Sequence, residues 1–189
     1  RQIIYKDIDI GLSKSKQAAK AASALNPDIS ILQHATSLNT DNVQSLLTNH
    51  DLVIDCTDNA ETRYLIGDAA HRYARPLVFG GAVRMEGQVS VFQSGVKGYE
   101  GTPCYRCVFP AMPDLKQAPS CSEVGILGPI AGLVGTLQAL EAIKLILGES
   151  KTLTGRLLLI EGADSNFIEI KTNTRVNCSC CGYAAEGPL

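Results

Sequence analysis

The sequence predicts an α/β protein whose doubly wound, mostly parallel sheet continues into antiparallel strands and whose cysteines form a four-thiolate zinc site. Three observations lead to this prediction. Short apolar runs alternate with helical segments through the first half of the chain, which is typical of parallel α/β sheets. Two runs near the end have the pattern of a β-hairpin. Four cysteines form two C-x-x-C pairs, a spacing typical of metal ligands.

Helices and strands are expected to alternate along the first half of the chain. The strands are placed where short apolar runs end in polar residues, as buried parallel strands do. In order, we expect a helix at 13–25, a strand at 29–32, a helix at 41–48 capped by Thr40 or Asp41, a strand at 52–55, a helix at 59–73 and a strand at 76–79. Gly80-Gly81 is expected to break this pattern.

The second half begins with an alternating strand, expected at 87–92. The segment 94–122 is irregular and rich in Gly and Pro, and loops of this length are usually functional. The runs at 156–160 and 167–171 are expected to pair as the hairpin.

One apolar stretch, Val124–Gly148, is long enough to cross a membrane. However, Gln138, Glu141 and Lys144 interrupt it, and three polar groups in one membrane span would be costly. We therefore expect a buried amphipathic helix that begins near Gly125.

Composition and charge indicate an ordinary globular domain. The chain has 189 residues, 45% of them hydrophobic and 19% charged, and its formal net charge is -2. This length suits one domain, and the charge gives no reason to expect nucleic acid or an acidic membrane as a partner. The chain starts at Arg1 without an initiator Met or a signal peptide, so we expect a fragment of a cytoplasmic protein.

The two cysteine pairs, Cys104/Cys107 and Cys178/Cys181, can place four thiolates tetrahedrally around zinc. Their long separation adds only about 1 kcal/mol of loop-closure cost over a compact zinc ribbon, whereas structural zinc binding is worth on the order of 10 kcal/mol. Cys180 could compete as a ligand. The alternatives are unrelated thiols or a redox pair, although a redox pair would normally open a helix.

Asp58 and Asn59 follow the strand expected at 52–55, where a helix begins. Ligands of open α/β sheets bind at the carboxyl ends of strands, and Mg²⁺ takes one or two carboxylates plus phosphate oxygens. Asp58 is therefore a candidate to hold Mg²⁺ beside a triphosphate, unless it caps the helix. Arg63 lies one helical turn past Asn59, where it reaches the same pocket or is a solvated helix charge.

Arg1 and Lys14 are candidate phosphate contacts, because Arg offers a planar fork and Lys a point charge. Both are common surface residues, and Lys16 and Lys20 are neighbouring alternatives to Lys14.

Seven short segments together resemble the MoeB/ThiF family, the ancestors of ubiquitin-activating enzymes, over nearly the whole chain. The segments are Arg1-Gln2, Gly11-Leu12-Ser13-Lys14, Asp55-Cys56-Thr57-Asp58-Asn59, Met85-Glu86-Gly87-Gln88, Pro103-Cys104-Tyr105-Arg106-Cys107, Leu137-Gln138-Ala139-Leu140-Glu141-Ala142-Ile143-Lys144 and Cys178-Ser179-Cys180-Cys181-Gly182. The run from Cys104 to Pro110 resembles most closely the eukaryotic branch, the adenylyltransferase–sulfurtransferase of molybdopterin synthesis and of the ubiquitin-related modifier used in tRNA thiolation.

The resemblance implies a Rossmann-like fold and a function. The function is ATP-dependent adenylylation of the C-terminal glycine of a ubiquitin-like sulfur-carrier protein, which feeds sulfur transfer for molybdopterin synthesis or tRNA thiolation. ATP, Mg²⁺ and Zn²⁺ are the implied cofactors, and a homodimer without membrane or direct nucleic-acid contacts is the implied assembly. Residues 1–189 would form a single adenylation domain, without the rhodanese domain that normally follows in the eukaryotic branch.

The same resemblance assigns roles to individual residues. Arg1 matches the family arginine that contacts ATP phosphates, Lys14 the nucleotide-contacting lysine, and Asp58 the acid associated with magnesium. Asn59 and Arg63 are expected to complete the nucleotide site. The family's zinc ligands correspond to the two cysteine pairs of this chain, Cys104/Cys107 and Cys178/Cys181.

Cys121 aligns with a cysteine that forms a thioester or sulfur-linked intermediate in some members of the family. It precedes the helix expected near Gly125, and a helix N-terminus would lower a thiol pKa. The alternative is an ordinary loop thiol.

One departure from the family pattern leaves other interpretations open. The family's Gly-rich turn, which cradles phosphate at a helix N-terminus, should precede Arg1 and is missing from this sequence. That fits a non-catalytic pairing subunit or an inactive fragment, although the presence of Arg1, Lys14 and Asp58 argues against it. The net charge weighs against a zinc-dependent nucleic-acid module, and a nicotinamide dehydrogenase would need a fingerprint that is lacking.

Overall fold

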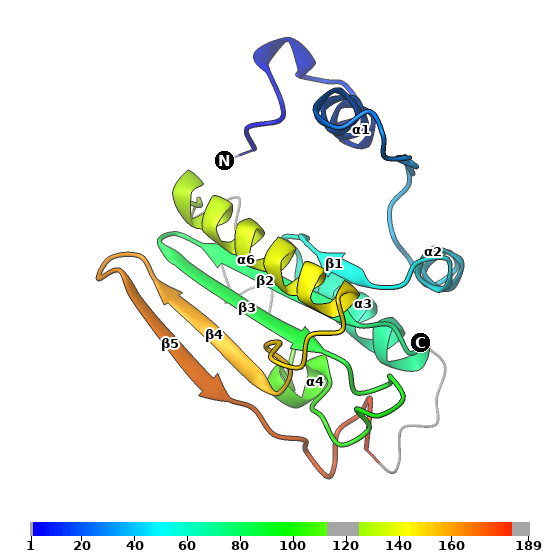
Figure 1. The fold of residues 1–189 in the computed structure, drawn as a ribbon, viewed down its shortest axis with the longest axis vertical. Helices are drawn as coiled ribbons and strands as arrows, with labels where there is room; N and C mark the ends of the chain where they lie inside the picture. The colour runs from blue at the N-terminus through cyan, green and yellow to red at the C-terminus, as the bar shows by residue number, and fades with distance from the viewer. Residues whose placement is uncertain (1, 113–124, 183–189) are drawn as a thin grey trace. The chain divides into compact units, whose positions relative to one another are not determined.

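A computed structural model describes residues 2–112 and 125–182 of the chain. The chain divides into two compact units, Arg1–Leu38 and Asn39–Leu189, both drawn in Figure 1. The second unit contains all five strands of the sheet.

The first unit contains a short 3-10 helix, η1 (Asp7–Asp9), and the helix α1 (Lys14–Leu25). Ser13 caps α1, because its hydroxyl accepts the N–H of Lys16 at 3.4 Å. The helix predicted at 13–25 is therefore confirmed. The strand predicted at 29–32 is wrong, because this segment has no strand structure.

The second unit is built on one five-stranded sheet with the order β1-β2-β3-β4-β5 (Figure 1). The strands are β1 (Val53–Asp55), β2 (Leu77–Val83), β3 (Glu86–Phe92), β4 (Arg156–Glu161) and β5 (Asn166–Lys171). β1 and β2 are parallel, whereas β2–β3, β3–β4 and β4–β5 are antiparallel. The α/β class, the antiparallel continuation and the hairpin are thus confirmed, and the parallel part in the described residues is smaller than expected.

The glycine pair lies inside β2, so the strand predicted at 76–79 is longer than expected. The alternation of strands and helices does stop here, as predicted, because β3 follows β2 without a helix between them. β2 continues through Gly80 and Gly81 to Val83. A Cβ atom on Gly80 would lie 2.3 Å from the Gln138 side chain, and one on Gly81 would lie 3.2 Å from Nη1 of Arg63. Glycine is needed here because two long side chains pass close to the strand.

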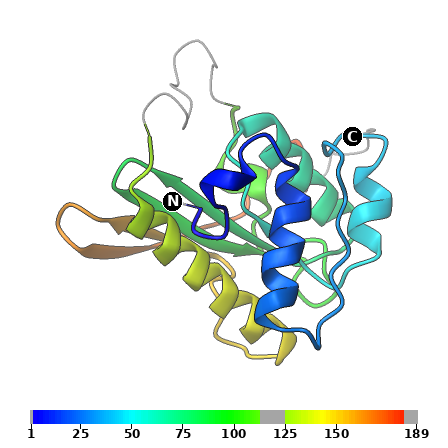
Figure 2. The ribbon, with the colours of Figure 1, turned by 90° about the horizontal axis from the view of Figure 1, so that it is seen from above.

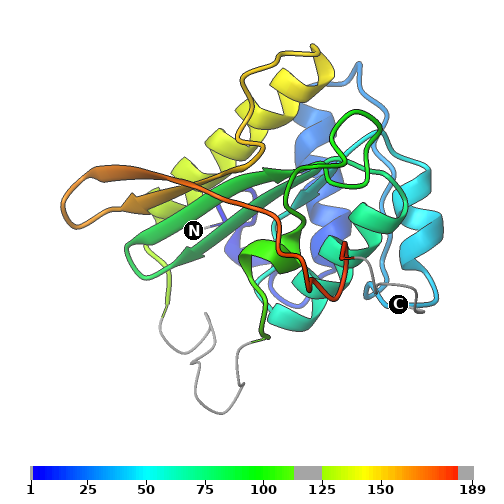
Figure 3. The same ribbon diagram turned by 90° about the horizontal axis from the view of Figure 1, so that it is seen from below.

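Helices cover both faces of this sheet. They are α2 (Val43–Thr48), α3 (Ala60–Arg72), α4 (Tyr105–Val108) and α6 (Gly128–Ile146). Figures 2 and 3 show α6 on one face and α3 with α4 on the other, and α6 contacts β2 and β3. The helix α4 was not expected within 94–122. The predicted caps of α2 are also wrong, because Asn42 holds the N-cap position without a side-chain hydrogen bond.

The helix α6 has the length and apolar composition of a membrane span, yet it uses its polar residues inside the fold. Gln138 and Glu141 are 3% and 4% exposed. The Gln138 amide donates to the carbonyl oxygens of Asp55 (2.7 Å) and Val78 (3.3 Å). Glu141 accepts a backbone N–H and pairs with Lys144. An amphipathic helix with one buried face therefore forms, as predicted.

Replacing Gln138 by Leu should destabilise the second unit. Leu has a similar volume, but it removes the hydrogen bonds that tie the ends of β1 and β2 to α6, at a cost on the order of 2 kcal/mol. Denaturant unfolding followed by circular dichroism measures this loss. The control is Gln44→Leu on the exposed surface of α2, which should change stability by less than about 0.5 kcal/mol. Equal effects of the two substitutions would contradict the prediction.

Candidate functional site

The loop after β1 is shaped by Asp55, a residue that sequence reasoning did not single out. Asp55 is 1% exposed, and its Oδ1 accepts the backbone N–H (2.8 Å) and the hydroxyl (2.7 Å) of Thr57. This turn closes the chain immediately after the strand. Its Oδ2 is buried and has no hydrogen-bond partner within residues 2–112 and 125–182. An acid at the end of a buried strand, followed two residues later by Thr, was the available signal.

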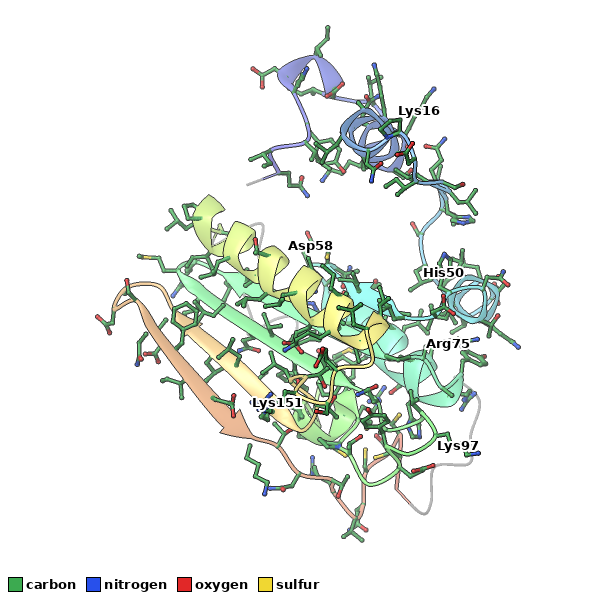
Figure 4. All side chains as sticks on the ribbon, viewed as in Figure 1. Lys16, His50, Asp58, Arg75, Lys97 and Lys151 are labelled. Atoms are coloured by element: carbon green, nitrogen blue, oxygen red, sulfur yellow. The ribbon has the colours of Figure 1, made fainter. Side chains whose placement is uncertain are left out.

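Asn59, rather than Asp58, caps α3. The Asn59 side chain accepts the N–H of Thr62 at 2.9 Å, so the alternative that Asp58 caps this helix is wrong. Asp58 is exposed, and Figure 4 shows it beside the end of β1 and the start of α3. Its carboxylate makes no recorded hydrogen bond or ion pair in the described part of the chain and is free to meet a cation.

Arg63 holds the same loop from the side of α3. Its Nε and Nη2 donate to the Thr57 carbonyl oxygen at 3.1 Å and 2.5 Å. Its guanidinium lies 5.4 Å from the ring centroid of Phe79, a favourable cation–π contact. The structure therefore turns Arg63 toward the loop and the sheet, and the alternative of a solvated helix charge does not hold.

A cavity of about 360 Å³ opens beside this loop. Its charged and amide lining comes from Asp58, Asn59, Arg63 and Gln88. The remaining lining is mostly aromatic and aliphatic and consists of Ala60, Tyr64, Phe79, Tyr105, Val108, Phe109, Pro110 and Ala111. A mostly apolar pocket with a few convergent polar groups is the usual form of a substrate site.

The wall of the cavity is tied down by Tyr64. Its hydroxyl lies 2.9 Å from the Phe109 carbonyl oxygen and 2.7 Å from that of Ala111, and it donates to them. Burial raises the pKa of Tyr105 further above its ordinary value. Cys121, predicted to form a covalent intermediate, lies outside the described residues, and its role stays a prediction.

The two cysteine pairs come together as predicted. Their four sulfur atoms lie within 4.8 Å of one another. The Sγ of Cys104 lies 3.8 Å from that of Cys107 and 3.4 Å from that of Cys178, and Cys107 lies 3.3 Å from Cys181. Four sulfurs at about 2.3 Å from a tetrahedral zinc ion would be about 3.8 Å apart. The cluster therefore has the size of a four-thiolate metal site.

Backbone N–H groups point at these sulfurs. The N–H of Arg175 donates to Cys107 at 3.4 Å, and that of Cys180 donates to Cys178 at 3.5 Å. Burial alone would raise the pKa of Cys178, but hydrogen bonds from backbone N–H groups of Cys181 and Cys180 lower it to about 7. At Cys178 such bonds favour the thiolate, which is the form that binds metals. The pKa values of the other three thiols are raised, by the neighbouring Cys180 thiol at Cys104 and by burial at Cys107 and Cys181. Cys180 contributes its backbone and is not part of the four-sulfur group.

Lys14 belongs to the first unit. Its ammonium donates to the Gln2 side chain at 3.3 Å and lies 6.0 Å from the Tyr5 ring centroid. Arg1, the residue before Gln2, is outside the described residues. Because Asp58 belongs to the other unit, a shared phosphate contact of Lys14, Arg1 and Asp58 stays a prediction.

Sequence comparison identifies relatives along nearly the whole chain. A family model described as the ThiF family matches residues 1–181. The chain is 41% identical over 182 residues to the adenylyltransferase and sulfurtransferase MOCS3 of Drosophila grimshawi, covering 96% of this chain and 40% of the relative. It is 40% identical to a sulfur carrier protein adenylyltransferase of Thermus thermophilus, covering 67% of that protein. The chain thus spans less than half of the insect relative.

Solved structures share the fold at low sequence identity. E. coli MccB with MccA-N7isoASN matches 96% of this chain and 55% of its own, with a TM-score of 0.79 and 18% identity. The structure of PaaA matches with a TM-score of 0.69 and 17% identity. These likenesses confirm the Rossmann-like α/β fold. With the family model covering residues 1–181 and two relatives at 40% identity or more, the chain belongs to the ThiF family.

Proposed function

We propose that the protein uses ATP to adenylylate the C-terminal glycine of a ubiquitin-like sulfur-carrier protein. The relatives described as sulfur carrier protein adenylyltransferase and as MOCS3 support this substrate class. The observation that carries the proposal is the unpaired Asp58 carboxylate, which lines the cavity at the carboxyl end of a parallel strand. The sulfur would serve molybdopterin synthesis or tRNA thiolation.

In the proposed reaction, the carrier's terminal carboxylate attacks the α-phosphorus of Mg-ATP. A bond forms between the carboxylate oxygen and the α-phosphorus, the bond to the β-phosphate bridge breaks, and pyrophosphate leaves. Asp58 would hold the magnesium of the substrate, while Arg1 and Lys14 neutralise phosphate charge. Asp55 and Arg63 keep the Asp58 loop in place through Thr57.

The cavity's aromatic wall has a separate task in this scheme. The acyl-adenylate is a mixed anhydride that water would hydrolyse, and an apolar enclosure excludes water from it. Tyr105 and Phe109 pack at 4.8 Å between ring centroids, and Tyr105 lies 5.5 Å from Phe79. Cys121 is proposed to attack the acyl carbon of the adenylate as a thiolate: a carbon–sulfur bond forms, the bond from that carbon to the AMP oxygen breaks, and AMP leaves, which gives a thioester or sulfur-linked intermediate.

We propose that the cysteine cluster holds Zn²⁺ in a structural role. Four protein sulfurs would complete the tetrahedral coordination and leave no open position for a substrate. The family resemblance also supports a homodimer and a cytoplasmic location, which are part of the proposal. An inactive pairing subunit is the less favoured alternative, because such a subunit would not need a free acid at Asp58.

Replacing Asp58 by Asn should abolish the first half-reaction. Loss of the carboxylate removes the magnesium contact, and ATP–pyrophosphate exchange by the full-length protein with its carrier should fall by about 100-fold or more. The matched control is Asp51→Asn, an exposed acid before β1, which should keep wild-type exchange. Undiminished exchange in Asp58→Asn would contradict the assigned role.

Replacing Cys104 by Ser should release the metal. The variant should bind less than one zinc per chain, measured by plasma mass spectrometry, and its melting temperature should fall by roughly 10 °C because structural zinc binding is folding free energy. Cys180→Ser is the control, because Cys180 lies outside the four-sulfur group. If the zinc content fell in Cys180→Ser but not in Cys104→Ser, Cys180 would be a ligand in place of Cys104 and the prediction would be wrong.

A further inference from the structure

We propose that Arg106, paired with Asp68, is a positioning residue that couples the four-cysteine cluster to the adenylylation cavity. The proposal rests on the function proposed above. Arg106 stands inside the first C-x-x-C pair, although four thiolates complete a zinc site without it. Its contacts are directed away from the sulfurs and toward α3.

The Arg106–Asp68 pair is bidentate. Nε of Arg106 lies 2.6 Å from Oδ1 of Asp68, and Nη2 lies 2.7 Å from Oδ2. The two side chains are 25% and 20% exposed. A fork of two parallel charge-assisted bonds fixes orientation as well as distance.

The pair joins the two helices between which the cavity lies. Asp68 is on α3, whose first turns also carry Arg63 and Tyr64, and α4 carries Tyr105 and Val108. The cavity is lined by Arg63 and Tyr64 from α3 and by Tyr105 and Val108 from α4. The position of α3 relative to α4 therefore sets the width of the cavity.

Two further contacts show how closely α3 and α4 pack. We call this contact region the seam; it contains Tyr64, Gly67 and Asp68 of α3 and Tyr105 and Arg106 of α4. The guanidinium of Arg106 lies 4.8 Å from the ring centroid of Tyr64, and the Tyr64 and Tyr105 rings pack edge to face at 5.2 Å. A Cβ atom on Gly67 of α3 would lie 2.7 Å from the Cβ of Tyr105. Any side chain larger than hydrogen at Gly67 would force α3 and α4 apart.

A chain of fixed contacts follows from this geometry. The sulfur cluster holds Cys104, the N-cap residue of α4, and Cys107 within α4, and Arg106 carries that constraint to α3. Because α3 and α4 both line the cavity, loosening the Arg106–Asp68 pair changes the width of the space that the carrier's tail would enter. Linkage makes the effect on affinity reciprocal: a carrier bound in the cavity should raise the affinity of the cluster for its metal. We expect the tighter binding to be seen as slower metal release.

The experiment uses the full-length, zinc-loaded protein and two substitutions that loosen the seam by different means. Arg106→Met removes the ion pair at similar length, and Gly67→Ala wedges the helices apart. The matched control is Arg156→Met, which breaks the Arg156–Glu169 ion pair (2.7 Å) on the exposed hairpin. Zinc release to the chelator 4-(2-pyridylazo)resorcinol and the KM and kcat of ATP–pyrophosphate exchange are measured for each protein.

Both seam variants should release zinc faster, by about threefold or more, and should raise the KM for the carrier by about tenfold, with kcat per zinc-loaded protein within about twofold of wild type. Saturating carrier should slow zinc release in the wild type and have less effect in the variants. The control should match the wild type in every measurement. The double variant Asp68→Arg with Arg106→Asp restores an ion pair with the charges exchanged. Its zinc-release rate and its KM for the carrier should lie closer to the wild type than those of Arg106→Met.

A merely structural role predicts another pattern. It lowers the active fraction, and therefore kcat, while the KM of the remaining folded protein is unchanged; that outcome overturns the proposal, as does zinc release at the wild-type rate in Arg106→Met. Absence of exchange in the wild type would instead overturn the proposed function. In that case the zinc-release comparison would still decide whether Arg106 supports the cluster.

Discussion

The convergence of four sulfur atoms is the constraint on which the candidate site depends. It brings the segment around Cys104 against the segment around Cys178, which lies beyond the sheet's last strand. The helix α4 is only four residues long, too short to be stable by itself. Its position on α3 is therefore set by the cluster and by side-chain contacts, and α4 in turn supplies one wall of the cavity. Under the proposed function, a metal held by these four sulfurs would therefore bear on substrate binding although it lies outside the cavity.

Local signals predicted those parts of the fold that depend on local interactions. The helices α1 and α3, the hairpin and the paired cysteines follow from periodicity, capping residues and spacing along the chain. The strand expected at 29–32 failed because strand formation needs a neighbour, and an apolar run alone carries no information about one. The helix α4 escaped prediction for the same reason, since only contacts with α3 and the sulfur cluster make four residues helical.

The site residues also differ in how far the sequence alone could identify them. Asp58 and the cysteines stood out because their chemistry follows from residue type and spacing. Asn59 and Arg63 were expected beside a nucleotide, and the structure shows structural contacts for both: one caps α3 and the other binds the Thr57 carbonyl. Asp55 was not singled out because its role depends on hydrogen bonds to Thr57, and these form only when the loop after β1 folds. Residues that position a site are harder to recognise than residues that act in it.

The two adjacent glycines of β2 show why a sequence pattern can be assigned the wrong cause. Successive residues of a strand face opposite sides of the sheet, so Gly80 faces α6 and Gly81 faces α3. The missing side chain of Gly80 makes room for Gln138, which donates to the Asp55 carbonyl oxygen, and that of Gly81 makes room for Arg63, which donates to the Thr57 carbonyl oxygen. The loop that presents Asp58 is consequently held from both faces of the sheet. A glycine pair that resembles a strand end thus keeps the strand intact and gives two side chains access to the same loop.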